Sequence, residues 1–347
     1  MSLSPVASLS LEEIIKQLLD ESELDKFLRC SSGPSKSEPG SAPRTELLHV
    51  RFSEDIPNIP ALGEYLSSQA VNYALSRRRR DAYLAELNKG SNSNLSAATR
   101  IVRAVRDAFI EFRKAYPSRA SEVGEVLAYC IAVHHLQAAQ LVAKMSLKTS
   151  ANMPVHGLDG IHAGVKDGVL NVFFLESKLA GSAASGAADY AKSVAGFGSD
   201  KKQYMREYGI VRDLGNLDVL DEAERGSLLE YLDVFGNLNA KKRERSVGVI
   251  CYSEKKHFSN GLPVDEEDIS KHEDHFNRLQ GADHKRYQDN VCGHLSKHGV
   301  NPAKCMVFFV AVPSVGQLRE EFYQALGIQP MDGEQDIDAD DDGEEQE

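Results

Sequence analysis

The sequence lacks long apolar runs: nowhere do 18 consecutive apolar residues occur, although apolar residues make up 41% of the 347. A membrane-spanning helix needs about 20 such residues, so we expect no membrane association. The first 30 residues have no basic segment ahead of an apolar one, so we expect no secretory signal. Cysteine is also scarce. Five cysteines, an odd and scattered set, favour a reducing cytoplasmic location over a disulfide framework.

Two motifs of common enzyme classes are missing as well. No G-x-x-x-x-G-K-[ST] motif occurs, so the chain is not expected to be an ATP-driven motor. No G-x-S-x-G motif occurs either, which argues against a hydrolase with a serine nucleophile elbow. The length accommodates one large domain with additions, or two domains.

Basic residues are fewer than acidic residues, and the acidic excess is unevenly distributed along the chain. The formal net charge is −12, and residues 332–347 hold ten acidic and no basic residues. Without this segment the balance is −12 + 10 = −2. The remainder of the chain is therefore nearly neutral and can carry a local basic patch, so the acidity argues little against a DNA substrate.

Composition changes along the chain indicate its organisation. Apolar spacing predicts a helix over residues 9–29, with Ser10 as its N-cap. A Ser/Pro/Gly-rich stretch, "SSGPSKSEPGSAPRT", follows it. The predicted regions are an N-terminal helix (1–30), a flexible linker (31–45), a helical accessory region (46–118), a core (119–328) and a disordered acidic tail (329–347).

The pattern of helices and strands predicts an α/β fold. Helices are expected at 61–88, 95–115, 121–145, 185–208, 219–233 and 314–326, with a mostly helical polar stretch at 264–298. Strands are expected at 47–52, 158–165, 168–179, 246–253 and 305–313, and Asp167-Gly168 is a hairpin turn signal between two of them. This order predicts a mixed central sheet with helices on both faces.

The strand at 168–179 carries an unusual pair of charges. Glu176 and Lys178 lie two residues apart, so they share one face of a strand that is otherwise almost wholly apolar. A buried charge is tolerable when it has a partner or a metal. Asp159 lies 17 residues before Glu176, across the predicted hairpin, so the two carboxylates are expected side by side.

Two adjacent carboxylates repel each other unless a cation lies between them. Mg²⁺ suits such oxygen ligands and retains waters and substrate phosphates, and Mn²⁺ can substitute for it. A metal-bound water can be activated to attack phosphorus. Lys178 is then placed to orient that water or to stabilise the negative charge of the transition state.

The arrangement Asp159, then Glu176-Ser177-Lys178, with Glu125 on the preceding helix, resembles the PD-(D/E)xK nuclease superfamily. The longer strings "GEVLAYCIAVHHL", "LDGIHAGVKDGVLNVFFLESKL", "SGAADYAKSVAGF" and "SVGVICY" resemble HamA, the family of nuclease subunits of the Hachiman anti-phage defence system. The resemblance extends over roughly residues 45–328.

That resemblance implies a restriction-endonuclease-like fold and a Mg²⁺-dependent DNA endonuclease, the effector of a defence complex with a helicase subunit. It implies that Asp159, Glu176 and Lys178 are catalytic, and that Asp159 and Glu176 bind the metal. Glu125 matches the extra acidic residue of many superfamily members, which adds it to the catalytic and metal-binding set. Leu158 stands where the usual motif has proline, and many members of the superfamily also lack that proline.

Several basic residues outside this motif are candidate contacts to DNA. Lys144 and Lys148 precede Asp159, and each either contacts the phosphate backbone of DNA or is a solvated surface lysine. His162 either touches a phosphate or makes a structural hydrogen bond. The run Arg77–Arg80 either binds phosphates or an acidic partner, or pairs internally with neighbouring acidic residues.

Two other functions are compatible with the sequence. The chain is alternatively a catalytically inactive nuclease-fold module that binds nucleic acid or the helicase. The third reading is an interaction protein whose function resides in the acidic tail and the arginine run.

Overall fold

The computed structural model describes residues 9–33, 42–89, 95–115, 122–145, 158–214, 216–238, 241–262 and 268–329. Seven strands of the described chain form one sheet in the order β1-β2-β9-β8-β7-β6-β5. Their bounds are Leu28–Ser32 (β1), Arg44–Val50 (β2), Ala139–Gln140 (β5), Gly160–Lys166 (β6), Val169–Ala180 (β7), Lys242–Ser253 (β8) and Cys305–Val312 (β9). The sheet is mixed: β7, β8, β9 and β2 run parallel to one another, while β1 pairs antiparallel with β2, β6 with β7, and β5 with β6.

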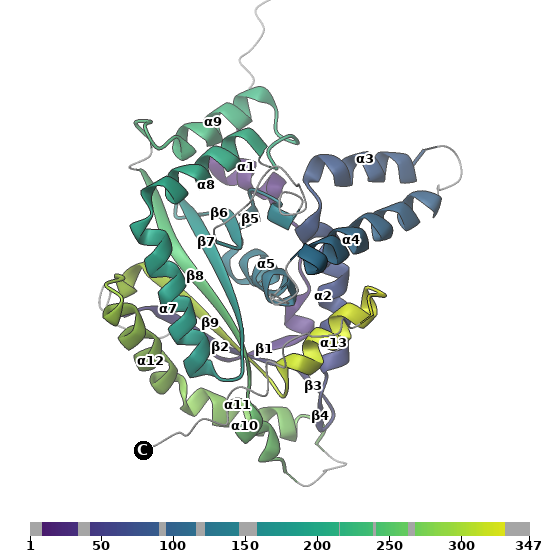
Figure 1. The fold of residues 1–347 in the computed structure, drawn as a ribbon, viewed down its shortest axis with the longest axis vertical. Helices are drawn as coiled ribbons and strands as arrows, with labels where there is room; N and C mark the ends of the chain where they lie inside the picture. The colour runs from purple at the N-terminus through teal and green to yellow at the C-terminus, as the bar shows by residue number, and fades with distance from the viewer. Residues whose placement is uncertain are drawn as a thin grey trace, which may run out of the picture.

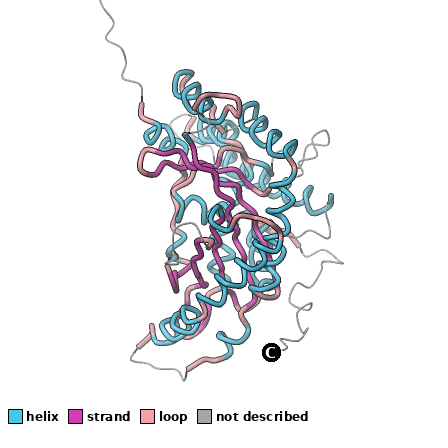
Figure 2. The backbone as a smooth tube through the Cα atoms, turned by 90° about the vertical axis from the view of Figure 1, so that its left-hand side faces the viewer, coloured by secondary structure: helices cyan, strands magenta, loops and turns pink. Residues whose placement is uncertain are grey.

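Helices cover both faces of this sheet, as Figures 1 and 2 show. One face packs against α2 (Ile59–Ala74), α4 (Leu95–Ala115), α5 (Glu122–Leu136) and α13 (Val315–Ala325). The other face packs against α1 (Leu11–Leu18), α7 (Ala183–Ser199), α8 (Lys201–Leu214), α9 (Glu222–Leu232), α11 (Lys271–Ala282) and α12 (His284–Lys297). The predicted α/β class, a mixed sheet flanked by helices, is confirmed.

The remaining elements are short or lie at the periphery. They are α3 (Arg77–Leu87), α10 (Lys255–Ser259), the two-stranded sheet of β3 (Phe52–Ser53) and β4 (Ile56–Pro57), and two 3₁₀ turns, Leu24–Lys26 and Pro302–Lys304. α3 packs against α4, and the two helices project together as an arm (Figure 1). We call α3 and α4 the arm below.

Two parallel strands in the middle of the sheet, β8 and β9, are buried on both faces. Every residue of β9 is buried, and so is the second half of β8. Strands covered by helices on both sides need apolar side chains on both sides, which explains the continuous apolar runs "CMVFFVAV" and "VGVICYS". These strands form a rigid platform beside β7, which carries the acidic and basic pair of the sequence motif.

The N-terminal region differs from its prediction. The single helix expected over residues 9–29 is wrong, because α1 ends at Leu18 and a 3₁₀ turn and β1 follow. Ser10 is the N-cap as predicted, in a capping box with Glu13. The segment then adds β1 to the sheet beside β2, so the region expected to be a separate helix contributes to the central sheet.

Three other predicted helices end earlier or divide. The helix expected over 61–88 becomes α2 and α3, separated at Leu75 and Ser76, which have extended backbones. The helix expected over 185–208 divides at Asp200, whose side chain accepts hydrogen bonds from the amides that open α8. The helix expected over 121–145 ends at Leu136, before Gln137, whose φ is 47°. Extended or left-handed backbone at Leu75, Ser76 and Gln137, and the cap at Asp200, thus ended helices that apolar spacing alone extended.

No helix in the described part of the chain has the length and apolar character needed to span a membrane.

Candidate active site

A tight hairpin places Asp159 beside Glu176. β6 and β7 pair antiparallel, joined at Asp167 and Gly168, whose φ values are 53° and 71°. Both residues thus adopt the left-handed backbone that a two-residue hairpin turn requires. The register pairs Gly160 with Leu175, and the Asp159 amide donates to the Leu175 carbonyl at 2.9 Å. The predicted hairpin and the predicted adjacency of the two acids are therefore confirmed.

The Asp159 carboxylate is held by the residue between the glutamate and the lysine. Its Oδ2 accepts hydrogen bonds from the Ser177 amide and from the Ser177 hydroxyl, both at 2.7 Å. Ser177 is buried. These two bonds fix the orientation of the carboxylate and leave its Oδ1 outside this pair of contacts.

Glu176 and Lys178 form a close, mostly buried ion pair. The Lys178 Nζ lies 2.7 Å from the Glu176 Oε1, and Glu176 is only 8% exposed. Burial, and then the negative charge of Asp159, raise the pKa of Glu176 to about 7, although Lys178 acts in the opposite direction. Burial alone would lower the pKa of Lys178, but attraction to Glu176 outweighs it, so this pKa is raised. The pKa of Glu176 thus stays raised even with the lysine in place, because burial and the neighbouring Asp159 both disfavour the charged form.

Glu125 approaches this site from the helix packed against the sheet. It lies in the first turn of α5, is 3% exposed, and accepts a hydrogen bond from the Tyr73 hydroxyl. A Cβ built on the preceding residue, Gly124, would lie 3.4 Å from the Ser177 hydroxyl oxygen. The first turn of α5 therefore lies against the strand segment that holds Asp159.

Tyr73 connects these acids electrostatically. Burial raises its pKa well above the usual value, and the negative charges of Glu125, Asp159 and Glu122 raise it further. Nothing in the sequence marked Tyr73, because it comes from α2, far from the motif. Ser177, by contrast, could have been found as the central residue of the E-x-K motif.

The described residues contain no group of three or more histidine, cysteine, aspartate or glutamate side chains close enough together to hold a metal ion. The structure thus brings Asp159 and Glu176 together. Glu125 lies in the first turn of α5, which packs against Ser177, and it does not complete a three-carboxylate set among the described residues. Two carboxylates are nevertheless sufficient for Mg²⁺, which completes its octahedral shell with water and substrate phosphates. Two neighbouring carboxylates whose negative charges repel each other are hard oxygen donors that fit such an ion. The metal-binding role of Glu125 stays a prediction.

The prediction that Lys144 contacts DNA is wrong in this structure. Its side chain is fully buried, and its Nζ donates to Glu207 at 2.8 Å and to the Leu158 carbonyl at 2.5 Å. Lys144 therefore anchors the backbone immediately before Asp159 from inside the protein. Lys148 lies outside the described residues.

His162 is not at the surface either. It is 1% exposed, it lies on β6, and burial lowers its pKa to about 3. Among the described residues neither ring nitrogen has a hydrogen-bond partner, and the ring lies 6.0 Å from that of Tyr129. Both predicted roles, a phosphate contact and a structural hydrogen bond, are therefore wrong; His162 is a neutral core residue.

The arginine run divides by helix face. Arg77 and Arg80 each bind Asp20 at 3.0 Å, and Arg77 also donates to the Leu18 carbonyl. Arg78 and Arg79 are exposed. Two of the four predicted DNA contacts are thus internal, and their partner lies in the N-terminal segment rather than on the same helix.

A comparison with models of known protein families identifies a match to this chain. The family model HamA matches residues 22–326, which is most of the 347-residue chain. No curated protein matches the chain.

Proposed function

Because this chain belongs to the HamA family, and so to the Hachiman anti-phage defence system, we propose that it is a Mg²⁺-dependent DNA endonuclease within that system. One observation carries the proposal: Asp159 and Glu176 lie side by side on paired backbone segments, with Lys178 2.7 Å from Glu176. This set of two acids and an amine at the end of a buried strand supports phosphodiester hydrolysis.

Asp159 and Glu176 would hold the metal. A bound Mg²⁺ would supply Lewis-acid chemistry, polarising the phosphate and making a bound water more acidic. The protein's own contribution is to keep both carboxylates fixed. The two hydrogen bonds from Ser177 orient Asp159, and the buried Lys144 fixes the backbone of Leu158 just before it.

Lys178 provides the amine of the site. Its raised pKa keeps it protonated at neutral pH, because the neighbouring carboxylate favours the charged form. In that state it orients a water through hydrogen bonding and stabilises negative charge on the phosphate oxygens. Glu125, held by Tyr73, orders the site from the side of α5.

A nicking assay on supercoiled plasmid tests this function. With Mg²⁺ present, Glu176→Gln and Lys178→Ala should each reduce cleavage by about a hundredfold or more, since each removes a group that acts directly on the reaction. Lys166→Ala is the matched control, because Lys166 is exposed at the far end of the same hairpin. Calorimetry with Mn²⁺ gives a second readout: binding should be lost in Asp159→Asn.

Full cleavage by Glu176→Gln would contradict the proposal. DNA binding by the wild-type protein without cleavage, with and without the helicase, would instead support an inactive nuclease-fold module. We further propose a separate helicase subunit as partner, since this family resemblance implies one and the sequence has no motor motif of its own. Co-purification of the two chains tests that step.

A further inference from the structure

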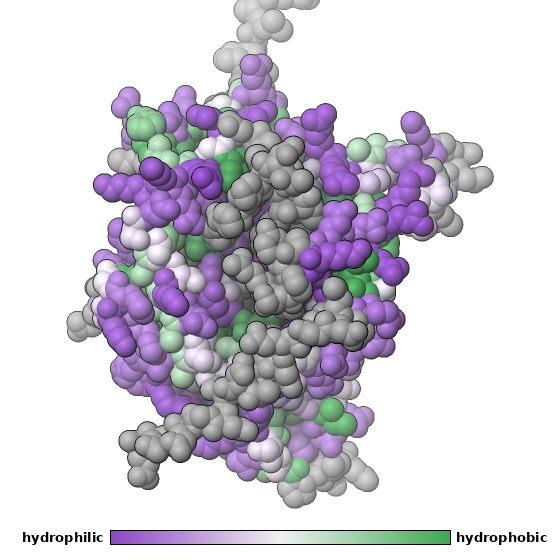
Figure 3. Space-filling model, in the orientation of Figure 1, coloured by the Kyte–Doolittle hydropathy of each residue, from purple (hydrophilic) through white to green (hydrophobic). Residues whose placement is uncertain are grey.

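The arm carries a row of exposed arginines. Arg100, Arg103 and Arg106 are all exposed on α4 and follow one another at intervals of three residues, so they lie along neighbouring positions of the helix surface. We call these three residues the arginine stripe. Residues 77–115 contain ten basic and four acidic residues, a net charge of +6 in a chain whose net charge is −12. Figure 3 shows that the surface over the arm is mainly hydrophilic.

The stripe is only partly neutralised by its own arm. Arg100 pairs with Glu86 of α3 at 2.7 Å. No ion pair to another described residue engages Arg103 or Arg106. Asp107 and Glu111 lie on the same helix, but they do not form ion pairs with these two arginines. The stripe therefore presents at least two uncompensated guanidinium groups to a negatively charged ligand.

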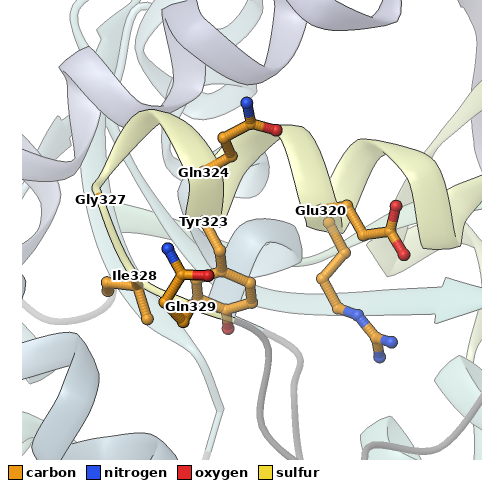
Figure 4. Close-up of a pocket in the computed structure, with 7 residues that line it drawn as sticks. Glu320, Tyr323, Gln324, Gly327, Ile328 and Gln329 are labelled. Atoms are coloured by element: carbon orange, nitrogen blue, oxygen red, sulfur yellow. The ribbon is translucent and has the colours of Figure 1, made fainter.

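The described chain ends beside this stripe. After α13, Arg113 of α4 donates to the Gln329 carbonyl at 3.2 Å. A Cβ built on Gly327 would lie 3.8 Å from the Arg106 guanidinium. Figure 4 shows Ile328 and Gln329 below the last turn of α13, where they line a cavity of 410 Å³ with Tyr323. The chain thus leaves the described structure at the side of α4 that carries the arginines.

We propose that the acidic segment that follows, residues 330–347, binds the arginine stripe of its own chain and shields it from other polyanions. The segment has ten carboxylates and no basic residue between 332 and 347. Arg103 and Arg106 supply guanidinium groups, which bind carboxylates through paired hydrogen bonds. The ligand class that fits the stripe is therefore present in the same chain and is tethered next to it.

The chain between Gln329 and the first carboxylate is long enough to reach the stripe. Because it tethers the acidic segment close by, weak contacts are sufficient for binding. From Gln329 to Asp332 the chain spans at most about 10 Å, and the stripe from Arg106 to Arg100 is about 9 Å long. A short flexible tether raises the effective concentration of a ligand to the millimolar range, so a segment of low intrinsic affinity still occupies the stripe. Because the contacts are exposed and ionic, salt will weaken them.

Binding of a peptide tests the proposal without using nuclease activity or DNA. The receptor is the full chain with the ten carboxylates of its own segment replaced by the matching amides, which leaves the stripe open. A fluorescent peptide of residues 330–347 should bind this receptor at low salt and lose affinity as salt is raised. Fluorescence anisotropy measures the dissociation constant.

The substitutions Arg103→Gln and Arg106→Gln, made together in the receptor, should lower its affinity for the peptide by about three- to thirtyfold. Lys201→Gln and Lys202→Gln form the matched control, since they remove two exposed charges on α8 and should change the affinity much less. The unmodified wild-type chain should bind the peptide at least about tenfold more weakly than the receptor, because its own segment competes.

Three results would overturn the proposal: no binding at low salt, equal binding by the stripe variant, and equal binding by the wild-type chain. Concentration-dependent dimerisation of the wild-type chain, abolished by neutralising the segment, would instead assign the stripe to the acidic segment of a second copy. If the wild-type chain and the receptor with the neutralised segment bound duplex DNA equally well through the stripe, the stripe would be a nucleic-acid surface that the segment leaves open. All of these outcomes are independent of whether Glu176→Gln abolishes cleavage.

Discussion

The end of β7 and the arm use the same kinds of charged side chain in opposite ways. At β7, Glu176 and Lys178 are largely buried and bind each other. On the arm, Arg103 and Arg106 are exposed, with no ion pair to another described residue. Removing a charge from water is costly, so the buried groups persist only with partners fixed by the fold. The exposed groups need none, so they remain free to bind something else.

The arginine run contains both cases within one turn of helix. Arg77 and Arg80, three residues apart, face inward to Asp20, while Arg78 and Arg79 face solvent. The comparison teaches that position on the helix, not residue type, decides whether a charge contributes to stability or to binding. The following predictions test that difference.

The largest effect is expected at the fully buried ion pair. Lys144→Met leaves Glu207 buried without its cation, and the free energy of unfolding should fall by about 3–5 kcal/mol. Urea denaturation measures it. The exposed pair Lys16–Glu12 is the control, and Lys16→Met should change stability by about 0.5 kcal/mol or less.

Adding Glu207→Leu to Lys144→Met should recover most of the loss, because the double variant no longer buries an unpaired charge. If the free energy of unfolding of Lys144→Met equalled that of the wild type, burial would not explain why some charged residues contribute to stability and others do not.

A smaller effect, dependent on pH, is expected at Glu122 in the first turn of α5. Burial raises its pKa to about 7, against the opposing hydrogen bond from the Tyr323 hydroxyl. Because the folded state favours the protonated carboxyl of Glu122, the contribution of this group to the free energy of unfolding is highest below pH 4.5, the ordinary pKa, and falls as pH rises through 7. Glu122→Gln should therefore match the wild-type stability near pH 4.5 and exceed it by about 3 kcal/mol at pH 8.

Denaturation curves at several pH values measure this difference. The exposed Glu64 of α2 supplies the control, and Glu64→Gln should follow the wild-type curve. A constant offset between Glu122→Gln and wild type across the range would exclude titration of Glu122 as the cause.

The smallest effects compare neighbours within the arginine run. Arg77→Gln should lower stability by about 1–2 kcal/mol, because Arg77 donates to both Asp20 and the Leu18 carbonyl. Arg78→Gln should change it by less than about 0.5 kcal/mol. Thermal unfolding of both variants measures the contrast, and equal losses would mean that the two faces of α3 do not differ.

Sequence patterns predicted much of the site but little of what surrounds it. The turn at Asp167-Gly168 and the strand ending in Glu176 and Lys178 were both identified, because turn chemistry and strand alternation act over a few residues. Predictions for helix ends were less successful. Apolar spacing continued through Ser76, where the backbone is extended, and through Asp200, whose side chain caps a new helix. The partners of Lys144 and of Arg77 were missed, since they lie 63 and 57 residues away in the chain.

By itself the sequence determined that Asp159, Glu176 and Lys178 would meet, because a two-residue hairpin fixes the register and the register fixes which side chains are neighbours. Tertiary structure alone decided that Lys144 and His162 are interior groups and that only part of the arginine run faces solvent. Burial depends on which distant helices and strands pack over a side chain, and no local pattern contains that information. The same packing brought Tyr73 of α2 to Glu125 of α5 behind the paired acids.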